Sequence, residues 1–175
     1  KGTNACITIQ CASSAMAVAE SASAIINGEA DRFVAVGHDS VLEPEHMLYY
    51  ETLGLLSREI PKPFDASRSG TVFGEGGGAI ILEKQSDAVE RGAEVIGEFL
   101  GFGSTCEATG TVELNPTGEG LRRAIEEALE NAGLVPSDVG MICAHGNGTK
   151  ASDLTEGLAI EAVFGGNIPP VTAFK

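Results

Sequence analysis

The chain has 175 residues, of which 43% are hydrophobic and 21% charged, a balance typical of a folded globular protein. Its formal net charge of -14 argues against nucleic acids and anionic membrane surfaces as partners, because both are bound through lysine and arginine. No apolar run approaches the roughly 20 residues of a membrane span, and the four cysteines form no Cys-x-x-Cys pair, so we expect a reduced, cytoplasmic protein.

The first third of the chain predicts a strand, a helix and a second strand. Residues 6–9 are apolar and β-branched, as in a short buried strand. Residues 12–27 carry small and apolar side chains at helical spacing, and Gly28 is a suitable helix stop. Residues 33–37 predict another buried strand. The predicted inner face of the helix consists of Ala12, Ala15, Met16, Ala19, Ala22, Ser23 and Ile26.

The middle of the chain predicts short elements separated by loops. Residues 47–56 indicate a helix, and the prolines within residues 61–63 enforce an extended path. Residues 79–83 predict a strand, residues 85–91 a short helix and residues 94–102 a further strand. Bulges or close approaches of the backbone are expected at three glycines near this last strand: Gly97, Gly101 and Gly103.

The last third alternates helix and strand again. Residues 120–131 have an amphipathic pattern that ends before Gly133, and residues 141–144 predict a buried strand. A helix over residues 153–164 and a strand over residues 170–173 follow. This alternation predicts a mainly parallel α/β sheet covered on both faces, with ligands at the carboxyl ends of its strands.

Three chemically active residues, Cys11, His145 and Lys175, each follow a predicted strand. Cys11 precedes a helix, whose unpaired N–H groups and dipole favour a thiolate, so it is a candidate nucleophile; the alternative is a small buried hydrophobic residue. His145 opens the glycine-rich loop 145–149, where an imidazole can donate to a ligand, although a lone histidine in a loop can be incidental.

The other cysteines and histidines carry weaker signals. Cys6 and Cys143 lie in apolar predicted strands and are assigned to the core, whereas Cys106 in a polar loop is undetermined. His38 and His46 are interpreted as structural. The absence of a His-Glu-x-x-His pattern excludes a helical zinc protease site.

Glycines and carboxylates elsewhere have structural interpretations. The Gly-Glu-Gly-Gly-Gly run at residues 74–78 follows a proline-containing loop and precedes a strand, so we expect a tight turn packed against another backbone rather than a phosphate site. No P-loop or hydrolase nucleophile motif is present. Asp153 and Glu156 share one face at a helix start, where carboxylates suit the dipole and can cap the helix.

Several segments match, in order, the motifs of one enzyme family. They are the nucleophile turn at residues 11–14, a helix end and strand at 26–31 and 34–37, a glycine-rich loop and strand at 63–70 and 74–78, a histidine motif at 144–149 with Asp153 and Glu156, and a lysine motif at 172–175. Together they resemble the condensing enzymes of the thiolase fold, specifically β-ketoacyl-[acyl-carrier-protein] synthases and polyketide ketosynthase domains.

The resemblance implies an α/β protein with the thiolase-like layered αβαβα fold, of which this chain is an incomplete, central piece. It places the end of the N-terminal half, with the nucleophile, in residues 1–102. Residues 103–175 are then the start of the C-terminal half, with the histidine and lysine motifs. In that family a second catalytic histidine lies shortly beyond the lysine, so we expect these residues alone to be inactive.

The resemblance also implies a reaction, the decarboxylative Claisen condensation of fatty-acid or polyketide synthesis. Cys11 would take an acyl group from a carrier-protein thioester, with its own backbone N–H as half of the oxyanion hole. His145 would stabilise the enolate that malonyl-carrier protein forms when it loses CO2, or assist the decarboxylation. Lys175 is implied as a charge partner in the site, with Glu156 as its carboxylate counterpart.

Substrate contacts and partners follow from the same resemblance. Thr149 and Asn147 are implied to contact the phosphopantetheine arm, although family members usually carry threonine at the position of Asn147. No metal and no cofactor is implied beyond the phosphopantetheine of the acyl carrier protein. That carrier protein and a second ketosynthase subunit, in a homodimer or heterodimer with the strand before Cys11 at its edge, are the implied partners.

Two alternatives remain open. A non-catalytic thiolase-fold partner subunit would use these segments only for dimer packing. A thiolase-type acyltransferase would keep the nucleophile Cys11 but would not decarboxylate its substrate.

Overall fold

The computed structural model describes residues 2–110 and 114–174. The chain forms two compact units, one of residues 1–41 with 74–99 and the other of residues 42–73 with 100–175. The chain therefore leaves the first unit after residue 41, returns to it at residue 74 and leaves it again after residue 99. The predicted division into residues 1–102 and 103–175 stays a prediction.

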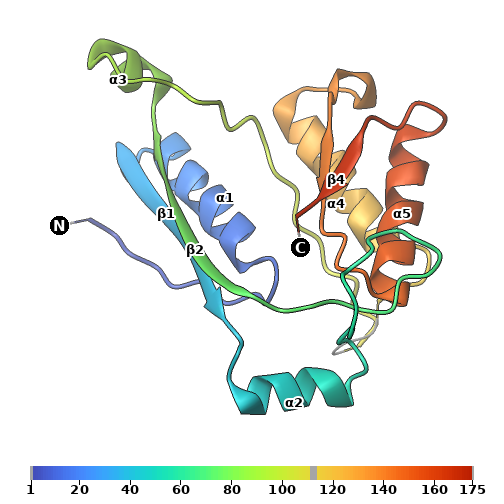
Figure 1. Cartoon of the computed structure of the whole chain (residues 1–175). Helices are drawn as coiled ribbons and strands as arrows, with labels where there is room; N and C mark the ends of the chain where they lie inside the picture. The colour runs from blue at the N-terminus through green and yellow to red at the C-terminus, as the bar shows by residue number, and fades with distance from the viewer. Residues whose placement is uncertain (1, 111–113, 175) are drawn as a thin grey trace. The chain divides into compact units, whose positions relative to one another are not determined.

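The first unit consists mainly of one helix packed on a two-stranded sheet (Figure 1). Helix α1, Ser13–Ile26, lies along antiparallel strands β1, Arg32–Ser40, and β2, Glu75–Glu83. A short helix, α3, Gln85–Glu90, follows β2. Most buried residues of α1 and β1 are small, which permits a close approach of helix and sheet: Ala19, Ser21, Ala22 and Ala35, with Ile25 as the one larger side chain.

The predicted helix is confirmed in α1, and its inner face is partly wrong. The helix ends before Gly28, whose φ of 75° lies in the left-handed region that glycine adopts without steric cost. Ile25 is buried, while Ile26 is 79% exposed. Because successive residues of a helix point about 100° apart, the two isoleucines cannot both face the sheet.

The strands of the first unit pair in antiparallel direction, whereas the sequence predicted parallel pairing. All of β1 pairs with β2 in antiparallel register, from Arg32 opposite Glu83 to Ser40 opposite Glu75, so the prediction of a mainly parallel sheet is wrong here. The order of elements along the chain does not determine which strands pair or in which direction. Residues 75–78 extend β2, so the tight turn predicted at residues 74–78 is also wrong.

Two predicted strands are absent from the described residues, and the predicted burial of cysteines is wrong. Residues 6–9 and 94–102 form no ladder; an isolated bridge joins Ile9 to Cys11. An apolar, β-branched segment becomes a strand only when another strand satisfies its backbone N–H and C=O groups. Cys6 is therefore exposed rather than in the core.

Burial follows one face only in the strands that contain Ala35 and Ala144. Ala35 is buried under α1, whereas its neighbours Val34 and Val36 are 56% and 54% exposed, so the expected burial of the whole strand is wrong. Cys143 is exposed beside the buried Ala144. Successive strand residues point to opposite faces, and in these two strands only alternate residues are covered.

In its described residues, the second unit contains three α-helices and a short parallel sheet. Helix α2, Pro44–Thr52, precedes the loop up to residue 73. Helices α4, Glu119–Ala132, and α5, Lys150–Phe164, pack together beside strands β3, Ile142–Ala144, and β4, Val171–Ala173 (Figure 1). A 3-10 turn, Pro136–Asp138, leads into β3. The strands pair in parallel, as predicted for this part of the chain.

The segment before α4 is irregular and lies directly on that helix. A Cβ atom placed on Gly103 would be 2.0 Å from the carbonyl oxygen of Ala124, and one on Gly101 would be 2.8 Å from the amide nitrogen of Ala132. The predicted close approaches are confirmed at these two glycines. No described atom lies within 4 Å of a Cβ placed on Gly97.

The described helices can be compared with the prediction that the chain has no membrane span. Among residues 2–110 and 114–174, no helix combines the length and the apolar character needed to cross a bilayer.

The contact at Gly103 predicts a stability effect in the intact protein. Gly103→Ala should lower the free energy of unfolding by about 1–3 kcal/mol, because its methyl group overlaps the α4 backbone, which cannot yield as a flexible side chain does. The matched control is Gly97→Ala, where the added methyl group meets open space. Denaturant unfolding checks the difference, and equal stability of the two variants would contradict the packing described.

Candidate active site

His145 lies on the loop that joins β3 to α5. Strand β3 ends at Ala144, which pairs with Ala173 of β4, and residues 145–149 then lead directly into the helix. Gly146 and Gly148 have φ values of 45° and 79°, the left-handed conformation that this tight path requires. A Cβ atom on Gly146 would lie 2.5 Å from the Cβ of Ala173, so the loop passes too close to β4 for any larger residue.

The Glu156 carboxylate holds the start of this loop from the second turn of α5. Its Oε1 accepts the backbone N–H of His145 at 2.7 Å, and its Oε2 accepts that of Gly146 at 2.8 Å. Hydrogen bonds to an ionised carboxylate are stronger than neutral ones. Glu156 therefore fixes the backbone from which the imidazole projects.

The Asn147 side chain is turned into the loop. Its Oδ1 accepts both the N–H and the hydroxyl of Thr149 at 2.9 Å, which leaves Nδ2 facing the imidazole, 3.1 Å from His145 Nε2. The orientation of the amide is set by the backbone donor, since a backbone N–H cannot bond the amide nitrogen. Asn147 and Thr149 thus shape the loop and orient His145.

Asp153 connects the loop of residues 145–149, called the histidine loop below, to the loop of residues 63–70 in the same unit. The residue is 2% exposed, and its carboxylate accepts the N–H of Gly148 at 3.1 Å and that of Phe64 at 2.7 Å. The bond to Gly148 is local, as expected of a carboxylate at a helix start. The bond to Phe64 spans 89 residues and has no counterpart in the sequence pattern.

The loop over residues 63–70 is itself ordered by hydrogen bonds. Asp65 Oδ1 accepts the N–H and the hydroxyl of Ser67, both at 2.6 Å, and these donors lower the pKa of the Asp65 carboxyl below its usual value. Gly70 donates its N–H to the carbonyl of Gly148 at 3.0 Å. The loop over residues 63–70 therefore lies directly beside residues 145–149.

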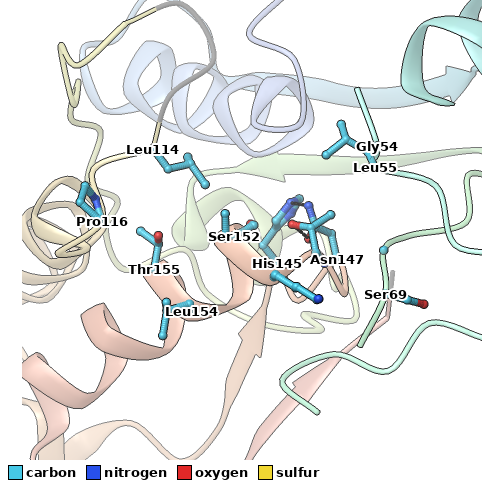
Figure 2. Close-up of a pocket in the computed structure, with 14 residues that line it drawn as sticks. Gly54, Leu55, Ser69, Leu114, Pro116, His145, Asn147, Ser152, Leu154 and Thr155 are labelled. Atoms are coloured by element: carbon cyan, nitrogen blue, oxygen red, sulfur yellow. Dashed lines mark hydrogen bonds between the residues drawn. The ribbon is translucent and has the colours of Figure 1, made fainter. Parts of the chain in front are cut away.

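A pocket in the second unit lies between these loops and the start of α5. Figure 2 shows His145 and Asn147 beside Ser152, and residues of three other segments also line the pocket: Gly54 with Leu55, Ser69 with Gly70, and Leu114 with Pro116. The predicted substrate-binding residues Thr149 and Asn147 and the predicted catalytic His145 all line this pocket. Its remaining lining residues are Lys150, Ala151, Leu154 and Thr155.

Cys11 lies in the first unit, exposed on the turn that precedes α1. Gln10 before it has a φ of 47°, which is uncommon for a residue other than glycine. Ser13 closes this turn, because its hydroxyl accepts the N–H of Ile9 and donates to the carbonyl of Gln10, both at 2.7 Å. The turn places an exposed Cys11 two residues before Ser13, the first residue of α1.

The other predicted site residues have different outcomes. Lys175 lies outside the described residues, so its pairing with Glu156 stays a prediction, as do the catalytic and binding roles of all six residues. The sequence-based predictions did not include the contacts made by Ser13, by Arg68 or by Phe64, the distant partner of Asp153. A serine at a helix start was the one available signal, since serine is common at such positions.

Metal binding has no support in the described part of the chain. Residues 2–110 and 114–174 contain no group of three or more histidine, cysteine, aspartate or glutamate side chains arranged to hold a metal ion. The expectation that the protein needs no metal or resident cofactor stays a prediction.

Family comparisons cover nearly the whole chain. Residues 1–88 match the family described as "Beta-ketoacyl synthase, N-terminal domain", and residues 96–175 match "Beta-ketoacyl synthase, C-terminal domain". The chain belongs to the β-ketoacyl synthase family, and the resemblance seen in its motifs is confirmed.

Curated relatives are similar over more than nine-tenths of the chain. A "3-oxoacyl-[acyl-carrier-protein] synthase 2" of Synechocystis sp. is 36% identical over 94% of the chain and 41% of the relative. "Nodulation protein E" of Rhizobium sp. is 38% identical over 92% of the chain and 40% of the relative. The chain thus spans about two-fifths of the length of these relatives.

Solved structures confirm the fold class. A type II polyketide ketosynthase, solved with its acyl-carrier protein and bound to a hexaketide, matches with a TM-score of 0.88 and 34% identity over 94% of this chain and 43% of that one. A β-ketoacyl synthase from Burkholderia phymatum gives the same TM-score with 30% identity, over 94% of this chain and 41% of its own. The chain has part of the thiolase-like α/β fold of these ketosynthases.

The two bonds to Glu156 predict a local effect. Glu156→Gln should lower the free energy of unfolding by about 1–3 kcal/mol and speed amide exchange at His145 and Gly146, because an amide nitrogen would then face a backbone donor. Glu161→Gln, at an exposed position of the same helix, is the control. Hydrogen exchange resolved at single residues is the measurement. Unchanged exchange in Glu156→Gln would show that these bonds do not hold the loop.

Proposed function

We propose that the protein is a β-ketoacyl-[acyl-carrier-protein] synthase that elongates an acyl chain by decarboxylative Claisen condensation. One observation carries the proposal above the others: this member of the family places an exposed cysteine, Cys11, on a strained turn at a helix N-terminus. A cysteine so exposed is accessible to a thioester on a carrier protein, and a subunit used only for packing has no need of it.

In the first step Cys11 becomes acylated. Its Sγ attacks the thioester carbonyl of an acyl-carrier protein, the bond from that carbonyl to the phosphopantetheine sulfur breaks, and the released thiolate takes up the proton that the Cys11 thiol loses. The backbone N–H of Cys11 stabilises the oxyanion that forms on the carbonyl oxygen during the attack.

In the second step the acyl group is extended by two carbons. Malonyl-carrier protein loses CO2, and the electron pair of the broken C–C bond forms an enolate that His145 stabilises. The enolate carbon attacks the acyl carbonyl on Cys11, and the cysteine thiolate leaves. The pocket beside His145 supports this assignment, since Thr149 and Asn147 offer polar groups to a phosphopantetheine arm within it.

The partners follow from the same proposal. An acyl carrier protein delivers both thioesters, and a second ketosynthase subunit completes a homodimer or heterodimer. Solved relatives support this, because one ketosynthase was solved with its acyl-carrier protein and another with its chain length factor. We place the reaction in the cytoplasm, where a reducing environment keeps cysteines such as Cys11 as free thiols.

The nucleophile is tested by acylation of the intact protein. Incubation with an acyl-carrier protein should attach one acyl group to Cys11, and Cys11→Ala should abolish that adduct because no other sulfur occupies the turn. Cys6→Ala is the matched control, since Cys6 is also exposed on the same segment. Mass spectrometry of the digested protein is the measurement. An adduct that persists in Cys11→Ala would refute the assignment and favour a non-catalytic partner subunit.

The decarboxylation step is tested through His145. His145→Ala should slow CO2 release from malonyl-carrier protein by roughly 100- to 1000-fold, the usual loss when a donor to a developing oxyanion is removed, while acylation of Cys11 continues. His46→Ala, at an exposed position of α2, is the control. Radiometric CO2 release measures the rate. If neither the unchanged protein nor the variant releases CO2 while Cys11 is acylated, a thiolase-type acyltransferase is the better description.

A further inference from the structure

Arg68 lies beside the histidine loop and reaches three carbonyl groups of its surroundings. Its Nη2 donates to Lys150 at 2.8 Å, its Nη1 to Asp65 at 2.9 Å and its Nε to Thr149 at 3.3 Å. The side chain is 16% exposed. A guanidinium has donors in a rigid planar fork, so one side chain joins the residue 63–70 loop to the first turn of α5.

The same guanidinium compensates the charge of Asp153. Arg68 Nε lies 3.7 Å from Asp153 Oδ2, and the Asp153 side chain has no solvent exposure. A carboxylate removed from water is stable only when charges and hydrogen-bond donors replace its hydration. The two N–H groups of Gly148 and Phe64 supply donors, and Arg68 supplies the opposite charge.

Phe64 transmits this arrangement to the histidine loop. Its φ of 63° is unfavourable for an aromatic residue, and its N–H is held by the Asp153 carboxylate at 2.7 Å. The ring lies against the loop, since a Cβ atom on Gly146 would be 3.3 Å from Phe64 Cε2. A change in the Asp153 carboxylate would therefore free the Phe64 N–H. The Phe64 ring would then no longer be held against Gly146, the residue after His145.

We infer that Arg68 is a positioning residue for His145, acting through Asp153 and Phe64. This inference rests on the proposed function for its catalytic consequence, but the structural linkage stands without it. Arg68 belongs to the unit that contains His145, and its partners Asp65, Thr149, Lys150 and Asp153 are not among the residues proposed to react. Its removal should therefore affect the step that needs His145 and spare the acylation of Cys11.

The test compares Arg68→Met with Arg58→Met in the intact protein. Arg58 belongs to the same stretch of chain, but its side chain is 94% exposed and its contact with Glu51 is 3.7 Å long. Arg68→Met should slow CO2 release from malonyl-carrier protein by roughly 10- to 100-fold, the scale of loss expected when a reacting group is misplaced. Cys11 acylation should match that of Arg58→Met.

Two further variants separate positioning from a general loss of structure. Arg68→Lys keeps the charge but not the fork, so its CO2 release should resemble that of Arg68→Met more than that of the unchanged protein. Phe64→Gly adopts the positive φ without strain but lacks the ring, so it should fold and still lose CO2 release selectively. Equal CO2 release in Arg68→Met and Arg58→Met, or full activity in Phe64→Gly, would overturn the inference.

Amide exchange distinguishes failure of the inference from failure of the proposed function. Exchange at Gly148 and Gly70 should be faster in Arg68→Met than in Arg58→Met, because both amides bond within the joined loops. If the unchanged protein releases no CO2, the proposed function fails while this measurement still decides the linkage. If exchange at both amides is unchanged, Arg68 does not hold the loops.

Discussion

The second unit depends on one buried carboxylate, that of Asp153. A charge without access to water is costly unless donors and an opposite charge surround it, and here Gly148, Phe64 and Arg68 provide them. Each of these groups belongs to a loop that has no regular structure of its own. Satisfying the carboxylate therefore selects one arrangement of both loops, and the pocket that contains His145 exists in that arrangement.

The cysteine and the histidine are held by different means, in keeping with the chemistry proposed for each. Cys11 is exposed on a short turn closed by Ser13, where a thiol can reach a thioester on a large carrier protein. His145 is half-buried, and its loop is held by the Glu156 carboxylate of α5, which accepts the backbone N–H of His145. A nucleophile requires access, whereas a group that stabilises a developing charge must be held in place before the charge forms.

Much of the fold was predictable wherever a local pattern was sufficient. The helical spacing over residues 12–27 and 120–131 matched α1 and α4, because one turn of a helix satisfies its own backbone. The strand predictions at residues 6–9 and 94–102 were wrong because a strand needs a partner that its own residues do not specify. The direction of β1 against β2 was wrong for the same reason.

The sequence by itself determined the family and the candidate nucleophile, histidine and carboxylates, because the order and spacing of motifs can be recognised without knowing which residues are in contact. Only the tertiary structure decided what the polar side chains do: Glu156 bonds the backbone of His145, and Asp153 bonds Phe64 across 89 residues. Both carboxylates share one predicted helix face. Their partners come from loops that meet only in the folded chain, and no periodicity encodes a contact between segments so far apart.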